Sequence, residues 1–187
     1  MNILIIGSGA REHALGKKIV DEGRKIYFAP GNGGTSDIGE NVDIKVDQID
    51  KLVDFAKDKN IDFTIVGPEL PLCQGIVDEF KKNDLKIFGV NKSSSRFESS
   101  KGFTKEFLNK YDINTAPYLK TDDKDKAINF AKDLLERNSK VVLKRDGLAA
   151  GKGVYIAQNK EEITKFIDDI FSKDKKIVIE EYIDGFE

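Results

Sequence analysis

The sequence opens with an uninterrupted apolar run at residues 2–6, which ends at Gly7. A strand with one face in water alternates apolar and polar residues, so an unbroken run indicates a parallel strand that is buried on both faces. Further short strands are predicted at residues 26–29, 43–46, 63–66 and 87–90, mostly separated by stretches with helical spacing of apolar residues. We therefore predict an α/β domain with a doubly wound, mainly parallel sheet and residues 2–6 as its central strand.

Two glycine-rich turns follow the first two predicted strands, at residues 7–14 and 30–35. The first turn leads into a helix, whose N-terminal N–H groups and dipole favour an anion at the carboxyl edge of the sheet. A dinucleotide site is excluded, because Glu12 replaces the third glycine of the G-x-G-x-x-G pattern and no ribose-binding acid follows the second strand. A phosphate or phosphosugar site fits both turns, and a flexible turn without a ligand is the alternative at residues 30–35.

A carboxylate follows the strand predicted at residues 63–66. Glu69 lies between Pro68 and Pro71, which stiffen the turn and hold the side chain at the same edge of the sheet. There it could accept hydrogen bonds from an amine or from ribose hydroxyls. The alternative is that Glu69 only favours the start of the next helix, predicted at residues 72–83.

The second half of the chain contains a predicted hairpin at residues 141–157, with three glycines and two lysines around its tip. These residues are Gly147, Gly151, Gly153, Lys144 and Lys152. Glycines permit a close approach of the backbone, so successive N–H groups could face a phosphate while the lysines supply positive charge. The pattern differs from the Walker loop, because no Ser or Thr follows Lys152 and no helix begins there. A solvated turn is the alternative.

Other elements surround this hairpin. Apolar residues at helical spacing predict helices at residues 93–111, 122–138 and 160–171, and a β-branched run predicts a strand at residues 177–179. Pro117 and the polar residues before it break the first of these helices and indicate a hinge. The predicted organisation is a first domain at residues 1–103, a linker helix and hinge at 104–119, and an α+β lobe at 120–187.

Composition excludes several functional classes. The net charge of −2 gives no general attraction to nucleic acid or to a membrane surface. No apolar run approaches the roughly 18 residues that a membrane span needs, and a cytoplasmic protein is predicted. Cys73 is the single cysteine and is interpreted as a packing residue, and the single His13 cannot form a histidine metal site. No metal ligands are predicted within this chain.

Six segments of the chain together resemble one enzyme family. Residues 142–154 read Val-Leu-Lys-Arg-Asp-Gly-Leu-Ala-Ala-Gly-Lys-Gly-Val. Matching segments occur in order at residues 7–14, 30–35, 66–72, 98–101 and 180–185. The joint pattern is similar to that of the phosphoribosylamine–glycine ligases, which belong to the ATP-grasp superfamily and act in purine synthesis. The resemblance implies that residues 120–187 form an incomplete ATP-grasp domain.

The resemblance implies roles for the lysines. Lys105 is expected to contact nucleotide phosphates, with Lys101 as the second choice, whereas the helix alone suggests a solvated lysine pair. Lys105, Lys144 and Lys152 are together expected to offset phosphate charge and so to act in catalysis.

The resemblance also implies an adenine and a phosphosugar site. Glu180 and the backbone of Glu181 and Ile183 are expected to meet the adenine. Glu187 would accept from the ribose hydroxyls, although Phe186 before it departs from the family pattern. The residues expected to bind phosphoribosylamine are Gly9, Arg11, Glu12, Gly31, Asn32, Gly33 and Glu69.

The implied reaction joins glycine to 5-phosphoribosylamine at the expense of ATP, through a glycyl phosphate, and gives glycinamide ribonucleotide, ADP and phosphate. The expected partners are these small molecules. Magnesium is the expected cofactor, with ligands downstream of this chain, so an N-terminal fragment without turnover of its own is expected. Two alternatives remain: another ATP-grasp carboxylate–amine ligase, and a non-catalytic module that binds nucleotides or phosphosugars.

Overall fold

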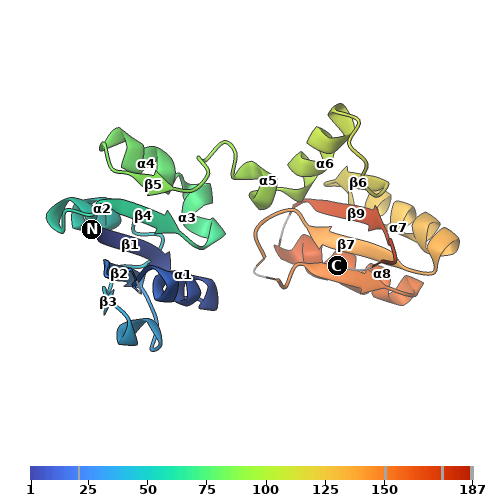
Figure 1. Cartoon of the computed structure of the whole chain (residues 1–187). Helices are drawn as coiled ribbons and strands as arrows, with labels where there is room; N and C mark the ends of the chain where they lie inside the picture. The colour runs from blue at the N-terminus through green and yellow to red at the C-terminus, as the bar shows by residue number, and fades with distance from the viewer. Residues whose placement is uncertain (21, 150, 174, 186–187) are drawn as a thin grey trace. The chain divides into compact units, whose positions relative to one another are not determined.

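The computed structural model of the chain describes residues 1–20, 22–149, 151–173 and 175–185. The chain divides into two compact units, Met1–Ser95 and Arg96–Glu187 (Figure 1). The finer division into a linker helix and hinge at residues 104–119 stays a prediction. Among the described residues, none of the helices is both long and apolar enough to cross a bilayer.

The first unit is built on a parallel sheet with the strand order β3-β2-β1-β4-β5 in the described ranges. Its strands are β1 (Asn2–Gly7), β2 (Lys25–Pro30), β3 (Glu40–Asn41), β4 (Phe63–Val66) and β5 (Ile87–Phe88). Its helices are α1 (Ala10–Val20), the 3-10 helix η1 (Thr35–Asp37), α2 (Ile49–Asp58), α3 (Glu69–Gln74) and α4 (Ile76–Lys82). The position of β1 confirms that residues 2–6 form the central strand.

Two apolar clusters show that this sheet is doubly wound. Leu4 and Ile6 of β1 pack in one cluster with residues of α2 and α4. Ile3 and Ile5 pack in another, with Ile19 of α1. Because successive side chains of a strand point to opposite faces, helices cover both faces of the sheet. Figure 1 shows α1 on the opposite side of the sheet from α2 and α4. The predicted α/β fold is confirmed.

The prediction of a strand at residues 43–46 is wrong. The pairing of β3 with β2 ends near Val42, whose N–H donates to the Phe28 carbonyl at 2.8 Å. The N–H of Ile44 then donates to the Val42 carbonyl at 2.7 Å, within the same segment and not to a neighbouring strand. Val42, Ile44 and Val46 nevertheless pack against the core. The alternating pattern in the sequence therefore reflects packing of an irregular segment and not pairing in a sheet.

Two predicted helices are each divided into two. The helix predicted at residues 72–83 begins earlier, at Glu69, and Gly75 separates α3 from α4 with a φ of 100°, a conformation that favours glycine. The helix predicted at residues 93–111 is divided into α5 (Arg96–Ser99) and α6 (Lys101–Lys110) by Ser100, which has an extended backbone. Apolar spacing continues on both sides of these breaks, so periodicity alone does not detect them.

The second unit contains an antiparallel sheet with the strand order β6-β9-β7-β8 in the described ranges. Its strands are β6 (Tyr118–Thr121), β7 (Val141–Arg145), β8 (Val154–Ala157) and β9 (Ile177–Glu181). Its remaining helices are α7 (Lys124–Asn138) and α8 (Lys160–Lys173). The pairing of β7 with β8 confirms the predicted hairpin.

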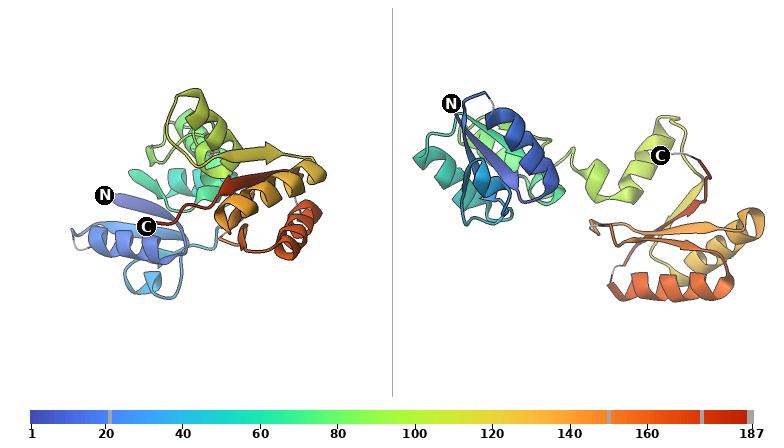
Figure 2. Two further views of the ribbon diagram at one scale, coloured as in Figure 1. Left: turned by 90° about the vertical axis from the view of Figure 1, so that its right-hand side faces the viewer. Right: turned by 60° about the horizontal axis from the view of Figure 1, so that its bottom comes forward.

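Helices α7 and α8 cover one face of this second sheet. Their apolar residues form a core with Leu143 of β7 and Ile179 of β9. Helix α6 lies on the other side of the sheet (Figure 2). Its Lys105 is paired with Glu180 of β9. Because α6 contacts β9 and is joined to β6, the neighbouring face of β7 and β8 is left with less cover.

Candidate functional site

The face of the second sheet opposite α7 and α8 carries both apolar and charged side chains. Cross-strand pairing places two rows of residues on this face: Ile156, Val142, Glu180 and Tyr118 in one row, and Val154, Lys144, Val178 and Lys120 in the next. Val154 and Ile156 are 48% and 47% exposed, although both are β-branched apolar residues in a strand. An apolar surface beside charged groups suits a ligand with a flat apolar part and an anionic part.

Glu180 lies between two lysines at the centre of this face. Its Oε2 is 2.9 Å from Lys105 Nζ, and its Oε1 is 2.9 Å from Lys144 Nζ. The side chains of Lys105, Glu180 and Lys144 are 11%, 8% and 26% exposed. Lys105 Nζ also donates to Thr115 Oγ1 at 2.6 Å and to the Ala116 carbonyl at 3.4 Å. We refer to Lys105, Glu180 and Lys144 as the lysine–glutamate cluster.

The lysine–glutamate cluster carries two ammonium groups and one carboxylate. Its formal charge is therefore +1, and because two of its side chains are largely removed from water this charge is screened less than a surface charge would be. The interpretation of Lys101 and Lys105 as a solvated pair is wrong for Lys105, which is buried. A partly desolvated site with a net positive charge and preoriented donors favours an anion.

Two of the three glycines of the hairpin between β7 and β8 stand where another residue would be strained, each for a different reason. Gly151 has a φ of 76°, which favours glycine. A Cβ on Gly153 would lie 2.4 Å from the Cβ of Ala149, so glycine is needed for this close approach. Apart from Gly147 itself and its two neighbours in the chain, no described residue has an atom within 4 Å of a Cβ built on Gly147. Lys152 is exposed, and its N–H donates to the Ala149 carbonyl at 2.9 Å.

The other residues predicted to bind adenine, Glu181 and Ile183, come after Glu180 in the chain, at the end of β9 and just beyond it. Glu181 accepts a hydrogen bond from Asn138 Nδ2 at 2.9 Å, and its backbone N–H donates to the Pro117 carbonyl at 3.0 Å. Ile183, beyond the end of β9, is 68% exposed. Glu187, which the sequence suggested as a ribose ligand, lies outside the described residues.

The first unit presents a second candidate site, at the carboxyl edge of its parallel sheet. A depression of about 440 Å³ is lined by Gly7, Ser8, Gly9, Ala10, Arg11, Glu12, Val46 and Pro68. The two predicted glycine-rich turns meet here, because Asn32 Nδ2 donates to the Ser8 carbonyl at 2.9 Å and Gly31 N–H donates to the Gly7 carbonyl at 3.1 Å. Gly33 stands in the second turn, where no described atom would lie within 4 Å of an added Cβ.

Glu12 braces the turn that forms this depression. It is 4% exposed, and its Oε2 accepts a hydrogen bond from Gly9 N–H at 2.5 Å. A Cβ on Gly67 would lie 1.9 Å from Glu12 Oε1, so the turn after β4 also makes room for this carboxylate. Glu12, which replaces the third glycine of the dinucleotide pattern, thus fills the space between the turn after β1 and the turn after β4.

Arg11 and Glu69 form an ion pair across the same edge. Arg11 Nη2 lies 3.1 Å from Glu69 Oε1, and both side chains are exposed. The pKa of Glu69 lies below its ordinary value, first because its own backbone N–H at the start of α3 bonds to the carboxylate and second because of Arg11. Glu69 therefore lies both at the start of a helix and at the edge of the sheet. This position is compatible with a role at the helix start and with a role in ligand binding.

Sequence reasoning missed the apolar part of the site on the second sheet. Val142, Val154 and Ile156 share one face of the sheet with the charged side chains of the cluster. The sequence pattern predicted these strands, but their shared exposed face was not recognised. The period of two along β7 and β8 was the available signal, since Leu143 and Ala157 of these strands face the core. In the described ranges, no group of three or more His, Cys, Asp or Glu side chains is arranged to hold a metal ion.

A doubly wound α/β unit followed by an antiparallel sheet with a glycine-rich hairpin, one buried lysine and one partly buried lysine defines an ATP-grasp protein. The family model "Phosphoribosylglycinamide synthetase, N domain" matches residues 1–98, and the model "Phosphoribosylglycinamide synthetase, ATP-grasp (A) domain" matches residues 99–187. The chain belongs to the phosphoribosylglycinamide synthetase family.

Individual relatives agree with this assignment. The chain is 43% identical over 195 residues to the phosphoribosylamine–glycine ligase of Clostridium acetobutylicum, a match that covers 100% of the chain and 46% of that protein. The crystal structure of the Thermotoga maritima phosphoribosylamine–glycine ligase matches with a TM-score of 0.76 and 29% identity, over 100% of the chain and 45% of that structure. The Staphylococcus aureus N5-carboxyaminoimidazole synthetase, solved in complex with ADP, shares the fold with a TM-score of 0.72 and 16% identity, over 97% of the chain and 46% of that structure. The chain thus spans about half the length of the relatives it matches.

Proposed function

We propose that this protein joins glycine to 5-phosphoribosylamine with the consumption of ATP, and that the second unit contributes part of its nucleotide site. The observation that carries the proposal is the lysine–glutamate cluster, which places two ammonium groups at an apolar sheet face next to a glycine-rich hairpin. Membership of the phosphoribosylglycinamide synthetase family supports the choice of substrates.

In this proposal the nucleotide lies on the second sheet. Lys105 and Lys144 bind the phosphates, and Lys152 with Gly147, Gly151 and Gly153 covers them from the hairpin. The base packs on Val154 and Ile156 and is held by Glu180 and by the backbone near Glu181 and Ile183. This arrangement uses the apolar and the cationic parts of the exposed face together.

The reaction needs activation because a carboxylate is a poor acyl electrophile. A glycine carboxylate oxygen attacks the γ-phosphorus of ATP, which forms glycyl phosphate and releases ADP. The amine of phosphoribosylamine then attacks the carbonyl carbon, loses a proton and expels phosphate, which leaves glycinamide ribonucleotide. The lysines neutralise charge on the transferring phosphoryl group, and no protein nucleophile is required.

The first unit holds the phosphosugar in this proposal. N–H groups at the start of α1 and the N–H of Gly33 face its phosphate, and Glu69 accepts from the amine or the ribose hydroxyls. Gly31 and Asn32 shape the turn, because their own N–H groups donate to the Gly7 carbonyl and to Thr35 Oγ1. Arg11 orients Glu69 through their ion pair. Magnesium is expected to accompany ATP, and none of its ligands is assigned to the described residues.

The test is an ADP-release assay on the protein expressed from its whole open reading frame, with ATP and magnesium. Repeated turnover to ADP should require glycine and phosphoribosylamine together, and mass spectrometry should identify glycinamide ribonucleotide. ADP formation with a different acid and amine would replace the proposal by another ATP-grasp ligase. Nucleotide binding without ADP formation from any such pair would instead indicate a non-catalytic binding module.

A further inference from the structure

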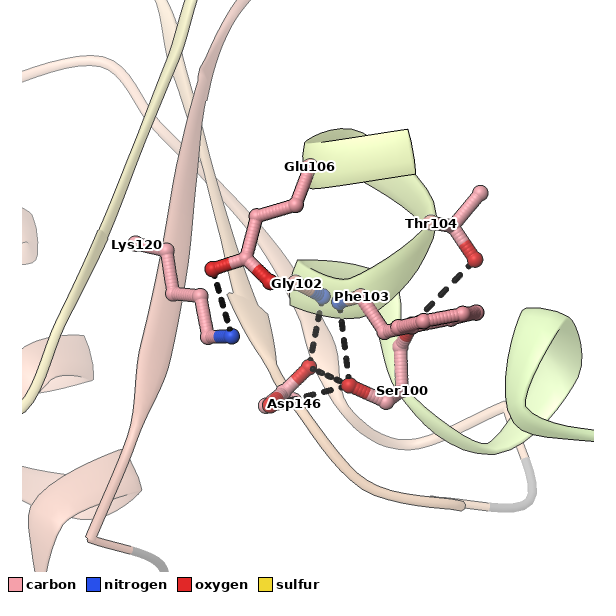
Figure 3. A network of polar contacts seen from close by, with 7 residues as sticks. All are labelled: Ser100, Gly102, Phe103, Thr104, Glu106, Lys120 and Asp146. Carbon is pink, nitrogen blue, oxygen red and sulfur yellow. Dashed lines mark hydrogen bonds and ion pairs between the residues drawn. The ribbon is translucent and has the colours of Figure 1, made fainter. Parts of the chain in front are cut away.

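Asp146 lies at the base of the glycine-rich hairpin, directly after β7, yet its side chain bonds to a different element. Its Oδ1 accepts hydrogen bonds from the backbone N–H of Gly102 at 2.7 Å and from Ser100 Oγ at 3.1 Å (Figure 3). Its backbone carbonyl accepts from Lys101 N–H at 3.3 Å, and the next carbonyl, of Gly147, accepts from Lys101 Nζ at 3.1 Å. These contacts attach the hairpin base to the first turn of α6.

These contacts satisfy backbone donors that a helix start leaves without partners. Ser100, the residue before α6, accepts from Phe103 N–H at 3.1 Å, and Gly102 N–H donates to Asp146, which lies 44 residues further along the chain. Two adjacent donors of α6 are therefore capped, one by a local and one by a distant side chain. The negative charge of Asp146 also lies at the positive end of the helix dipole. The first turn of α6 is therefore formed together with the hairpin base.

Gly102 makes this approach possible. A Cβ on Gly102 would lie 2.6 Å from Lys120 Cδ and 3.2 Å from Asp146 Oδ1. Lys120 is in turn paired with Glu106 of α6 at 2.8 Å, which places it against the same turn of the helix (Figure 3). A side chain at position 102 would push Asp146 and Lys120 away from the helix.

Helix α6 also carries Lys105, one turn beyond Gly102. We propose that Asp146 is a positioning residue that sets the spacing between the glycine-rich hairpin and the lysine–glutamate cluster. Asp146 directly follows β7, the strand that carries Lys144, and directly precedes the tip of the hairpin. Its carboxylate accepts a hydrogen bond from α6, the helix that carries Lys105. The hairpin and the two lysines are thereby kept in register for one polyphosphate. This role rests on the proposed function.

The test compares Asp146→Ala with a matched helix cap that has no link to the hairpin. Asp123 caps α7 and accepts from Lys126 N–H at 3.0 Å, so Asp123→Ala removes a similar cap from the same unit. Hydrogen exchange is measured on the ligand-free protein, and binding of ATP and of adenosine is measured by calorimetry. Asp146→Asn, which keeps an acceptor oxygen without the charge, serves as the conservative variant.

Asp146→Ala should speed exchange at the hairpin and at the first turn of α6 by about tenfold, since a lost cap weakens local structure. It should raise the Kd for ATP about tenfold while the Kd for adenosine changes less than about twofold, and Asp146→Asn should restore part of the ATP affinity. Asp123→Ala should change exchange only in α7 and should leave both constants unchanged.

The positioning role would be overturned if the hairpin amides exchanged hydrogen at the same rate in Asp146→Ala as in the wild type. It would also be overturned if Asp146→Ala lost affinity for ATP and for adenosine by the same factor. If Asp146→Ala does not fold, Ser100→Ala must show the same selective changes and Asp146→Asn a smaller form of them, and the absence of these changes would equally overturn the positioning role. If the wild-type protein binds no ATP, the proposed function fails, while the exchange of the hairpin amides still decides whether Asp146 holds it.

Discussion

Replacing Glu180 with glutamine is expected to destabilise the second unit by about 3 kcal/mol. The carboxylate is 8% exposed and holds Lys105 Nζ and Lys144 Nζ at 2.9 Å each. Removing one member of a buried ion pair costs roughly 3–5 kcal/mol, because a charge is left without compensation. Lys105 stays buried beside Thr115, whereas Lys144 is 26% exposed and can turn toward water, so the lower end of this range applies.

The measurement is urea unfolding followed by tyrosine fluorescence. The chain has five tyrosines and no tryptophan, and the four at positions 111, 118, 155 and 182 all belong to the second unit. Glu136→Gln is the control, because Glu136 pairs with Lys160 at 3.0 Å on the surface, with side chains 64% and 56% exposed. This control should change the free energy of unfolding by less than about 0.5 kcal/mol. A similar small change for both variants would refute the reasoning.

A second measurement tests whether the Glu180 carboxylate competes with an anion for Lys105 and Lys144. Inorganic tripolyphosphate lacks a base and a sugar, so it can interact only with the cationic groups. In Glu180→Gln the two lysines lack their carboxylate, and added tripolyphosphate should raise the midpoint of urea unfolding more than it does in the wild type. An equal rise in both proteins would show that the lysines are not the groups that bind the anion.

Three further predictions concern the candidate sites. Lys144→Ala should cost about 2–4 kcal/mol of transition-state stabilisation, and an unchanged kcat/KM for ATP in the whole enzyme would contradict its assignment. Gly153→Ala should lower the free energy of unfolding by about 1–3 kcal/mol because its Cβ would lie 2.4 Å from a neighbouring Cβ, whereas Gly147→Ala should leave it nearly unchanged, and equal effects would argue against this packing. Arg11→Ala should raise the pKa of Glu69 only part of the way to its ordinary value, because the backbone N–H is the larger cause, and a carboxyl NMR titration checks this. Since this pKa is lowered, the stability that Glu69 contributes is present above its unfolded pKa and is lost as pH falls through the folded value.

The fold of the first unit could be predicted because its signals are local. An unbroken apolar run has few structural solutions besides a strand buried on both faces, and the turn after Gly7 gave the position of the carboxyl edge. The start and end of helix α7 in the second unit could be predicted for the same reason, since Asp123 caps its start and Ser139 ends it in a left-handed conformation. In each case the decisive physics lies within about ten residues of chain.

The arrangement of the candidate nucleotide site could not be predicted in the same way. A period of two places Lys144 on the same face as its neighbours two residues away, but it does not say which residues of other strands lie opposite. The register of β7 with β9 pairs Val142 with Glu180, and only the packing of α6 brings Lys105 to the same carboxylate. The break at Ser100 that positions α6 depends on Asp146, which is 46 residues further along the chain. These are tertiary contacts, and no local pattern encodes them.

A carboxylate at the centre of an anion site has a physical explanation. The ammonium groups of Lys105 and Lys144 repel each other, whereas a carboxylate shared between them attracts both and holds their orientation before any ligand arrives. A phosphate that reaches Lys105 and Lys144 must then compete with Glu180, so the observed affinity is the difference between two strong interactions. In the proposed reaction, this difference limits how tightly ADP is held after phosphoryl transfer. Glu180→Gln in the whole enzyme is therefore expected to retain ADP longer than the wild type does, and its turnover is expected to fall through slower product release as well as through lower stability.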